Sequence, residues 1–339
     1  MTRLRNTAAW SLACSAIVMA VALPAWAAET DQPALAVGQG ERLLVVAPHP
    51  DDETLGAGGL VQRVRARGGS VRIVLITLGD GYVEAVVHET GKPRPRPAEY
   101  IRYGERRLLE ARAAVRRLAP DGVRLQFLGF PDGGLDALLR AHWWRSQRER
   151  SATTRASDPP YTDALEPDCP YDGDDLRREL ENILREFQPT LIAYPDLHDV
   201  HPDHRATGLF TMLAVTDWLG ATVKASAAAP RLLAYLIHWP NWPPGWQTPV
   251  PEAQADQVAL ELPAELQQEG PERILTLTDQ ELATKRVALA QHITQQEQTG
   301  ALLAAFVRRT EPFMPIAYSQ VQREVATIDR HIPLTPSRH

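Results

Sequence analysis

Two short stretches of the sequence concentrate side chains that bind metal ions and transfer protons. They are residues 49–53, with the sequence HPDDE, and residues 198–204, with the sequence HDVHPDH. Each follows an apolar segment that predicts a buried strand. Ligands of open α/β sheets bind beyond the carboxyl ends of the strands. We therefore expect the two stretches to face one another across a single crevice.

The spacing within these stretches suits a zinc ion. Catalytic zinc usually has three protein ligands and one position left for water. His49 and Asp52 lie three positions apart on a tight loop, and His204 would complete the set. Adjacent carboxylates on non-helical backbone diverge, so one of Asp51 and Asp52 would bind the ion while the other serves as general base. Spacing alone leaves open which of the two takes which role.

The second stretch also predicts the start of a helix. Pro202 and Asp203 suit a first helical turn, where a fixed φ and a negative charge are favoured. Residues three apart share one face of a helix, so His201 and His204 would address the same volume. Any one of these histidines alone would more often be structural. The four histidines and five carboxylates of the two stretches together favour a functional site.

The remaining pattern alternates strands and helices. Strand patterns cover residues 42–47, 71–77, 123–128, 190–194 and 232–238, and helical patterns cover residues 54–67, 99–118, 176–187 and 203–219. This alternation predicts an α/β fold with a mainly parallel, doubly wound, Rossmann-like sheet and helices on both faces. We expect a single domain with long active-site loops. The glycines of residues 56–59 lack the spacing of a dinucleotide-binding loop, and no P-loop or Gly-x-Ser-x-Gly motif occurs.

The first 27 residues have the features of a signal peptide. Arg3 and Arg5 precede an apolar run over residues 8–23, and Ala25-Trp26-Ala27 resembles a signal-peptidase site. The run is shorter than the ~20 residues of a spanning helix, so we expect cleavage before Ala28 rather than an uncleaved membrane anchor. The mature protein would then be secreted or periplasmic, with no stable membrane span. Residues 28–40 would form an N-terminal linker.

Composition narrows the function classes further. Cleavage would remove two of the 36 basic residues and none of the 42 acidic ones, leaving a net charge of 34 − 42 = −8. Without a basic stripe, the sequence gives no support to a nucleic-acid partner. Only Cys169 of the two cysteines would remain. An intramolecular disulfide and a thiolate metal cluster are then excluded, so a metal must rely on His, Asp or Glu.

The motifs resemble those of the PIG-L (LmbE-like) deacetylase family. Residues 46–59, VAPHPDDETLGAGG, look like its opening signature, and residues 201–204, HPDH, are similar to its second. Residues 77–81, the Arg107-x-x-Glu110 pair and residues 129–135, GFPDGGL, also match recurring family features. The resemblance runs from about residue 43 to 208, with a weaker tail at 285–296. We accordingly assign residues 41–330 to a PIG-L-like deacetylase domain.

The resemblance implies a role for each matching residue. His49, Asp52 and His204 would bind Zn²⁺, and Asp51 would be the general base. His201 would stabilise the oxyanion or protonate the leaving amine, with Asp203 orienting it. The expected substrate is a small molecule or glycan that bears an N-acyl group, in particular an N-acetylated amino sugar. Arg107 and Asp132 are further candidates for substrate contacts.

Several alternatives stay open at this stage. The enzyme could act by the same mechanism on a longer N-acyl group or on an amine that is not a sugar. A secreted carbohydrate-binding protein without turnover is the alternative from another class, although binding alone has no use for Asp51 and His201. The tryptophans at 143, 144, 239, 242 and 246 either pack long loops onto the domain or offer platforms to sugar rings.

Overall fold

A seven-stranded sheet with the strand order β3-β2-β1-β4-β5-β7-β6 forms the centre of the fold. The computed structural model describes residues 34–222, 229–247, 254, 257–268 and 270–328. The strands are β1 (Arg42–Ala47), β2 (Ser70–Leu75), β3 (Val123–Phe127), β4 (Leu191–Pro195), β5 (Arg231–Tyr235), β6 (Arg273–Thr276) and β7 (Thr310–Ile316). The first five strands pair in parallel, while β7 runs antiparallel to both β5 and β6.

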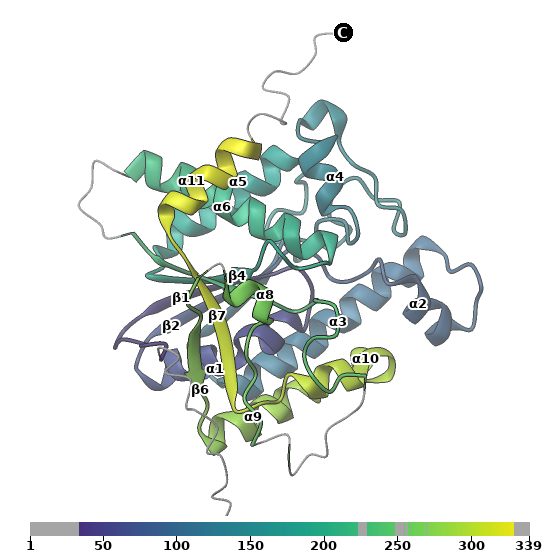
Figure 1. Ribbon diagram of the computed structural model, residues 1–339. Coiled ribbons are helices and arrows are strands. Elements are labelled where there is room, and N and C mark those ends of the chain that lie inside the picture. The colour runs from purple at the N-terminus through teal and green to yellow at the C-terminus, as the bar shows by residue number, and fades with distance from the viewer. Residues whose placement is uncertain (1–33, 223–228, 248–253, 255–256, 269, 329–339) are drawn as a thin grey trace, which may run out of the picture. The chain divides into compact units, whose positions relative to one another are not determined.

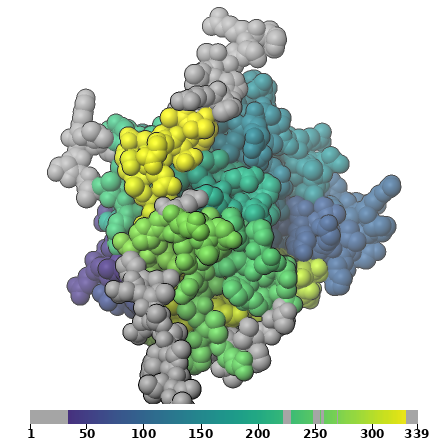
Figure 2. All heavy atoms as spheres, in the orientation of Figure 1, coloured from purple at the N-terminus to yellow at the C-terminus, as the bar shows by residue number. Residues whose placement is uncertain are grey.

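Helices cover both faces of this sheet (Figure 1). One face carries α1 (Asp52–Ala66), α3 (Pro97–Leu118), α9 (Asp279–Leu289) and α10 (Ile293–Ala305). The other carries α4 (Leu135–Arg140), α5 (Gly173–Phe187), α6 (Pro202–Thr222) and α11 (Tyr318–Ile328). Three further short helices are α2 (Val83–Thr90), which packs on α3, the 3-10 turn η1 (Arg145–Gln147) and α8 (Ala264–Gln267). Figure 2 shows α11 in yellow at the surface, where it packs on α6.

The central strand β1 is apolar because both of its faces are covered. Leu43, Val45 and Ala47 have no exposed surface, and α1 packs against β1 and β2. Glycines in α1 allow the helix to approach its neighbours closely. A Cβ at Gly56 would lie 2.4 Å from Cδ2 of Tyr235. A Cβ at Gly59 would lie 2.3 Å from Cδ2 of Leu277. These contacts bring the start of α1 tightly onto the carboxyl-terminal edge of the sheet.

The predicted α/β fold, with a mainly parallel sheet and helices on both faces, is confirmed. The fifth strand ends three residues earlier than predicted, because the amides of Ile237 and His238 donate to the Asp199 carboxylate at 3.1 and 3.0 Å instead of extending the sheet. The antiparallel strands β6 and β7 and the helices α2, α4, α9, α10 and α11 were not predicted.

Within the residues described here, no helix has the length and apolar character that a membrane crossing requires. The predicted signal peptide and residues 28–33 of the predicted linker lie outside the described residues. Cleavage before Ala28 stays a prediction.

Candidate active site

The two motif-bearing loops meet between the neighbouring strands β1 and β4. Val45 of β1 pairs with Ala193 of β4, and each strand ends at the same edge of the sheet. From β1 the chain builds outward to β2 and β3, and from β4 it builds the other way to β5. The order of strands therefore reverses here, which is where open α/β sheets form a crevice. The prediction that the two loops face one crevice is confirmed.

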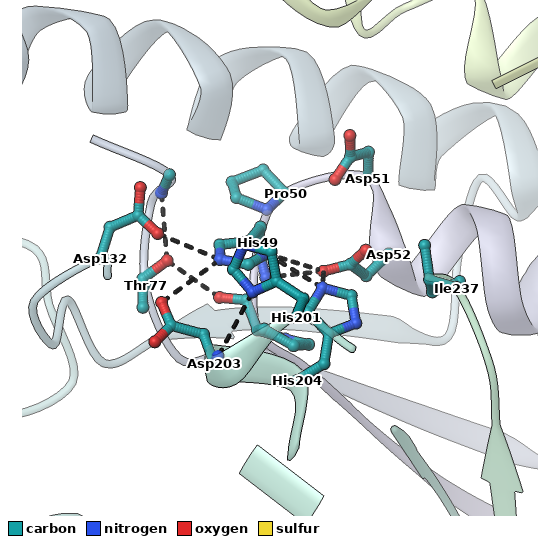
Figure 3. Close-up of polar contacts among 12 residues, drawn as sticks. His49, Pro50, Asp51, Asp52, Thr77, Asp132, His201, Asp203, His204 and Ile237 are labelled. Carbon is teal, nitrogen blue, oxygen red and sulfur yellow. Dashed lines mark hydrogen bonds and ion pairs between the residues drawn. The ribbon is translucent and has the colours of Figure 1, made fainter. Parts of the chain in front are cut away.

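Three predicted ligands converge on one point in this crevice (Figure 3). Oδ2 of Asp52 lies 3.1 Å from Nδ1 of His49 and 3.2 Å from Nε2 of His204. The two imidazole nitrogens are 3.3 Å apart. Tetrahedral zinc with ligands at about 2.0–2.1 Å would hold ligand atoms about 3.3 Å apart. The spacing of these three buried groups therefore fits a zinc-like ion.

The far nitrogen of each histidine faces a carboxylate. Nε2 of His49 lies 3.0 Å from Oδ1 of Asp132, and Nδ1 of His204 lies 3.0 Å from Oδ2 of Asp199. A carboxylate on the second ring nitrogen is the usual partner of a metal-binding histidine, because it fixes the ring and leaves the first nitrogen free to bind. Each imidazole is thus oriented with its other nitrogen toward Asp52.

The electrostatics of the cluster favour a bound cation. Burial opposes ionisation of the Asp52 carboxyl, but His204 and His49 hold its pKa well below its usual range. Burial also disfavours protonated His204, yet Asp199 and Asp52 raise its pKa to about 10. Four aspartates, the two named and Asp132 and Asp203, lie against two imidazoles. This excess of carboxylates over cationic partners creates a negative potential at the point where the ligand atoms meet.

Asp51 is held beside the cluster with an unusual backbone. Its φ of 134° lies outside the region that non-glycine residues favour. The Glu53 carboxylate accepts from the Asp51 amide at 2.9 Å, and the Leu55 amide donates to the Asp51 carbonyl at 2.8 Å. The Asp51 carboxylate lines the cavity rather than contacting His49 or His204 (Figure 3). Burial raises its pKa to about 8, against the opposing charge of Arg107.

His201 stands edge-on to His49, with ring centroids 4.9 Å apart. Its Nδ1 accepts a hydrogen bond from the backbone amide of Asp203 at 3.3 Å. An imidazole that accepts at Nδ1 carries its proton at Nε2, so His201 offers an N–H donor there. Burial and the neighbouring charges of His49 and His204 lower its pKa to about 3, which keeps the ring neutral.

The predicted partnership of Asp203 with His201 involves the backbone. The Asp203 carboxylate accepts from the amides of Gly133 at 2.7 Å and Leu135 at 3.2 Å, and lies 3.5 Å from Nε2 of His49. It thereby ties the helix start to the loop that carries Asp132. Its role in orienting His201 stays a prediction.

Arg107 and Asp132 both line the cavity, as substrate-contacting residues would. Arg107 is buried and donates to the Pro50 carbonyl at 2.9 Å and the Gly79 carbonyl at 3.2 Å. Asp132 accepts from the Gly81 amide at 2.6 Å besides its contact with His49. These bonds show that the two side chains order the loops around the site. A direct contact with substrate stays a prediction.

The sequence reasoning gave no role to Asp199 or His238. Asp199 is fully buried and accepts from the amides of His201, Ile237 and His238 in addition to facing His204. The His238 ring lies 4.7 Å from that of His204, centroid to centroid. Both residues occupy the carboxyl ends of strands, a position that could have drawn attention to them. Counting His238 as part of a strand concealed it.

A cavity of about 390 Å³ opens over the cluster. Its walls include Asp51 and His201 from the motif loops, Asp132 from the loop after β3, Tyr82 from the segment before α2, and Leu303 from α10. It therefore collects groups that can bind an ion, accept a proton and donate a hydrogen bond, within the lower range of small-molecule sites, which is about 300–1,000 Å³. The arrangement is that of a catalytic crevice.

Comparison with known proteins identifies the class. The sequence profile of the PIG-L family, described as GlcNAc-PI de-N-acetylase, matches residues 44–215. The chain belongs to the PIG-L family, as the sequence motifs predicted.

Two relatives by sequence agree with this assignment, and one solved structure is also similar to the chain. A protein of Saccharopolyspora erythraea named 1D-myo-inositol 2-acetamido-2-deoxy-alpha-D-glucopyranoside deacetylase 1 is 30% identical, over 82% of this chain and 88% of that protein. A deacetylase of the same name, without the numeral, from Salinispora arenicola is 28% identical, over 82% of this chain and 83% of its own length. The solved structure of N,N'-diacetylchitobiose deacetylase from Pyrococcus horikoshii is 19% identical over 82% of this chain and 84% of that one, with a TM-score of 0.48.

Proposed function

We propose that this protein is a zinc-dependent N-deacetylase that removes the acetyl group from an N-acetylated amino sugar or sugar conjugate. The observation that carries the proposal is the convergence of His49, Asp52 and His204 within 3.1–3.3 Å of one another, with Asp51 beside them in the same cavity. Membership of the PIG-L family and the names of the relatives support the substrate class.

His49, Asp52 and His204 would hold the ion. A zinc ion bound there would act as a Lewis acid that polarises the acyl carbonyl. It would also lower the pKa of water, so that the nucleophile could form near neutral pH. The carboxylates of Asp132 and Asp199 keep both imidazoles turned toward the ion. The protein thereby provides a prearranged site whose ligands need little reorganisation.

Asp51 would take the proton from the attacking water. Its carboxylate faces the cavity, and a pKa of about 8 lies close to the range in which general bases work best at neutral pH. Arg107, 3.4 Å from Oδ1 of Asp51, holds the carboxylate and the Pro50 carbonyl in place. Glu53 fixes the Asp51 amide from below. Arg107 and Glu53 therefore hold the strained backbone at Asp51 in place.

His201 would meet the oxygen of the tetrahedral intermediate or the departing amine. With Nδ1 occupied by the Asp203 amide, Nε2 is a neutral donor. A well-placed donor of this kind contributes about 3 kcal/mol to transition-state stabilisation. Breakdown releases acetate and the free amine, which takes up the proton that Asp51 collected.

The test combines metal analysis with amine release. Purified mature protein should contain about one zinc per chain. Chelation should abolish amine release from a panel of N-acetylated sugars, and added zinc should restore it. Asp51→Asn should keep its zinc and its melting temperature but lose on the order of 10²–10⁴ in kcat, because an amide accepts no proton. Retained turnover in this variant would move the role of base to another group.

We also propose that the protein is exported and that residues 1–27 are removed. The arginines, apolar run and small-residue pattern of the sequence support this location. Mass spectrometry of the protein recovered from the medium or periplasm of the expressing cell should give an N-terminus at Ala28. Recovery of only full-length chains in the membrane fraction would contradict it.

A further inference from the structure

A second cavity adjoins the catalytic one. It measures about 360 Å³ and shares His238 and Leu302 with the cavity over the metal cluster. Its remaining walls come from Val200 of the second motif loop and from the loop over residues 239–247. Because two of the walls are common, a molecule bound at the cluster can extend past His238 into this second space.

The loop that forms the second cavity is fixed in place. The Val200 amide donates to the His238 carbonyl at 3.0 Å, which ties the beginning of the loop to the second motif. Trp242 is buried, packs edge-on against Phe306 and donates from Nε1 to the Glu261 carbonyl at 2.8 Å. Arg308 donates to the Pro244 carbonyl at 3.2 Å. These contacts hold the loop against the rest of the domain, with Trp242 as its buried residue.

The other two tryptophans of the loop keep exposed surface, although Trp239 also packs in part against the hydrophobic core. Trp246 is 37% exposed and Trp239 is half-buried, while both line the cavity. Trp143, by contrast, is buried and stacks on Phe210 with ring planes 3° apart. Packing therefore explains Trp143 and Trp242 but leaves aromatic surface of Trp239 and Trp246 facing the cavity.

The polar groups of the cavity are uncharged. No aspartate, glutamate, lysine or arginine occurs among its described lining residues, whereas the catalytic cavity contains Asp51, Glu84, Arg107 and Asp132. Gln247 donates to the Asn241 side-chain oxygen at 3.3 Å. Within the described part of the chain, the amide nitrogen of Asn241 and the amide oxygen of Gln247 have no hydrogen-bond partner. Aromatic faces beside free amide groups suit a neutral ring with hydroxyl groups better than an alkyl chain or an anion.

We propose that this cavity is a subsite for a second, uncharged sugar ring joined to the acetamido sugar, with Trp246 and Trp239 as its specificity-determining residues. The inference rests on the proposed function, because it takes the acetamido group to lie at the metal cluster. The substrate is then a disaccharide or larger glycoside rather than a free monosaccharide. Its second ring lies against Trp246, and its hydroxyls reach Asn241 and Gln247.

The experiment compares substrates that differ beyond the acetamido sugar. They are N-acetylglucosamine, its galactose-extended forms with galactose at O4 or at O1, its 1-phosphate and its octyl glycoside. For wild-type protein we expect kcat/KM to be higher for one of the galactose-extended forms than for any of the others. Trp246→Ala should lower kcat/KM for that disaccharide about tenfold, the equivalent of about 1.4 kcal/mol, while kcat/KM for the monosaccharide stays within about twofold.

Two variants serve as controls. Trp246→Phe keeps an aromatic face and should restore most of the selectivity for the disaccharide. Leu109→Ala removes another apolar side chain, which is 61% exposed on α3 and lies outside the lining of both cavities. It should leave kcat/KM unchanged for both the monosaccharide and the disaccharide. Equal losses for monosaccharide and disaccharide in Trp246→Ala would overturn the subsite, as would a preference for the octyl glycoside or the phosphate that depends on Trp246.

Calorimetric binding separates failure of the subsite from failure of the proposed function. If no sugar releases amine, the proposed deacetylation fails, but the zinc-loaded protein should still bind the preferred disaccharide more tightly than N-acetylglucosamine, and Trp246→Ala should remove the difference. Equal affinities for the two sugars, or a difference that survives in Trp246→Ala, would refute the subsite whether or not turnover is observed.

Discussion

Asp199→Asn should lower the zinc affinity of the protein, although Asp199 is not itself a predicted metal ligand. The Asp199 carboxylate accepts from four donors: Oδ1 from the His201 amide at 2.9 Å, and Oδ2 from the Ile237 amide at 3.1 Å, the His238 amide at 3.0 Å and His204 Nδ1 at 3.0 Å. An asparagine offers one oxygen and one NH₂ group. Either orientation therefore turns an N–H group toward at least one donor in a fully buried position.

The expected cost has two parts. A buried donor left without an acceptor costs about 1–3 kcal/mol of unfolding free energy. Loss of the carboxylate behind a metal-binding histidine typically lowers metal affinity about 10–100-fold, or about 1.4–2.7 kcal/mol. Asp199→Asn should therefore melt at a lower temperature than the wild-type protein. The chelator concentration that removes its zinc should also be lower, in proportion to the loss of metal affinity.

Competition with a chromogenic chelator measures the affinity, and denaturant unfolding of the zinc-free protein measures the stability. Asp196→Asn is the matched control, because this buried carboxylate of the same loop binds the amide and Nδ1 of His198, both at 2.8 Å, rather than a predicted ligand. It should leave zinc affinity unchanged. Wild-type zinc affinity in Asp199→Asn, or an equal loss in both variants, would refute the reasoning.

His204→Ala should lose zinc and activity together. His201→Ala should keep zinc and show a lowered kcat with KM little changed, because the N–H donor of His201 acts mainly in the transition state. Metal analysis and steady-state kinetics test this, and loss of zinc from His201→Ala alone would mean that the two histidines exchange roles. Glu179→Gln should stabilise the protein at alkaline pH. Burial raises the pKa of Glu179 from 4.5 to about 8, so the contribution of its protonated form is fully present below about 4.5 and is lost as the pH rises through 8. Melting temperatures of the two proteins should diverge between pH 6 and pH 9, by some degrees, and parallel curves would contradict this explanation.

The parallel half of the fold could be predicted from the sequence because its strands carry their own signal. β1 and β4 are continuous apolar runs, as strands buried on both faces must be. β7 escaped prediction because Pro312 and Pro315 interrupt a strand pattern, and its position beside β5 depends on contacts with distant residues. The helices α9 and α10 have weakly amphipathic sequences, and they are positioned by tertiary packing, of α9 on α1 and α3 and of α10 on α9.

The candidate ligands could be predicted because each belongs to a polar stretch that follows a strand indicated by the sequence. The choice between Asp51 and Asp52 could not be made from spacing, since it depends on one backbone angle. The φ of 134° at Asp51 turns the two neighbouring carboxylates apart, and only Asp52 lies against both imidazoles. The role of Asp199 could not be predicted, because it depends on backbone amides. These are the His201 amide beside the start of α6 and the Ile237 and His238 amides almost forty residues away, and sequence patterns do not reveal such contacts.

The separation of 155 positions between His49 and His204 has a consequence for how the protein would acquire the proposed ion. A chain that has not yet paired β1 with β4 lacks the site altogether, so ion capture follows completion of the central sheet. An ion held by the proposed site would cross-link the two halves of the molecule, and its free energy of binding would add to the free energy of folding.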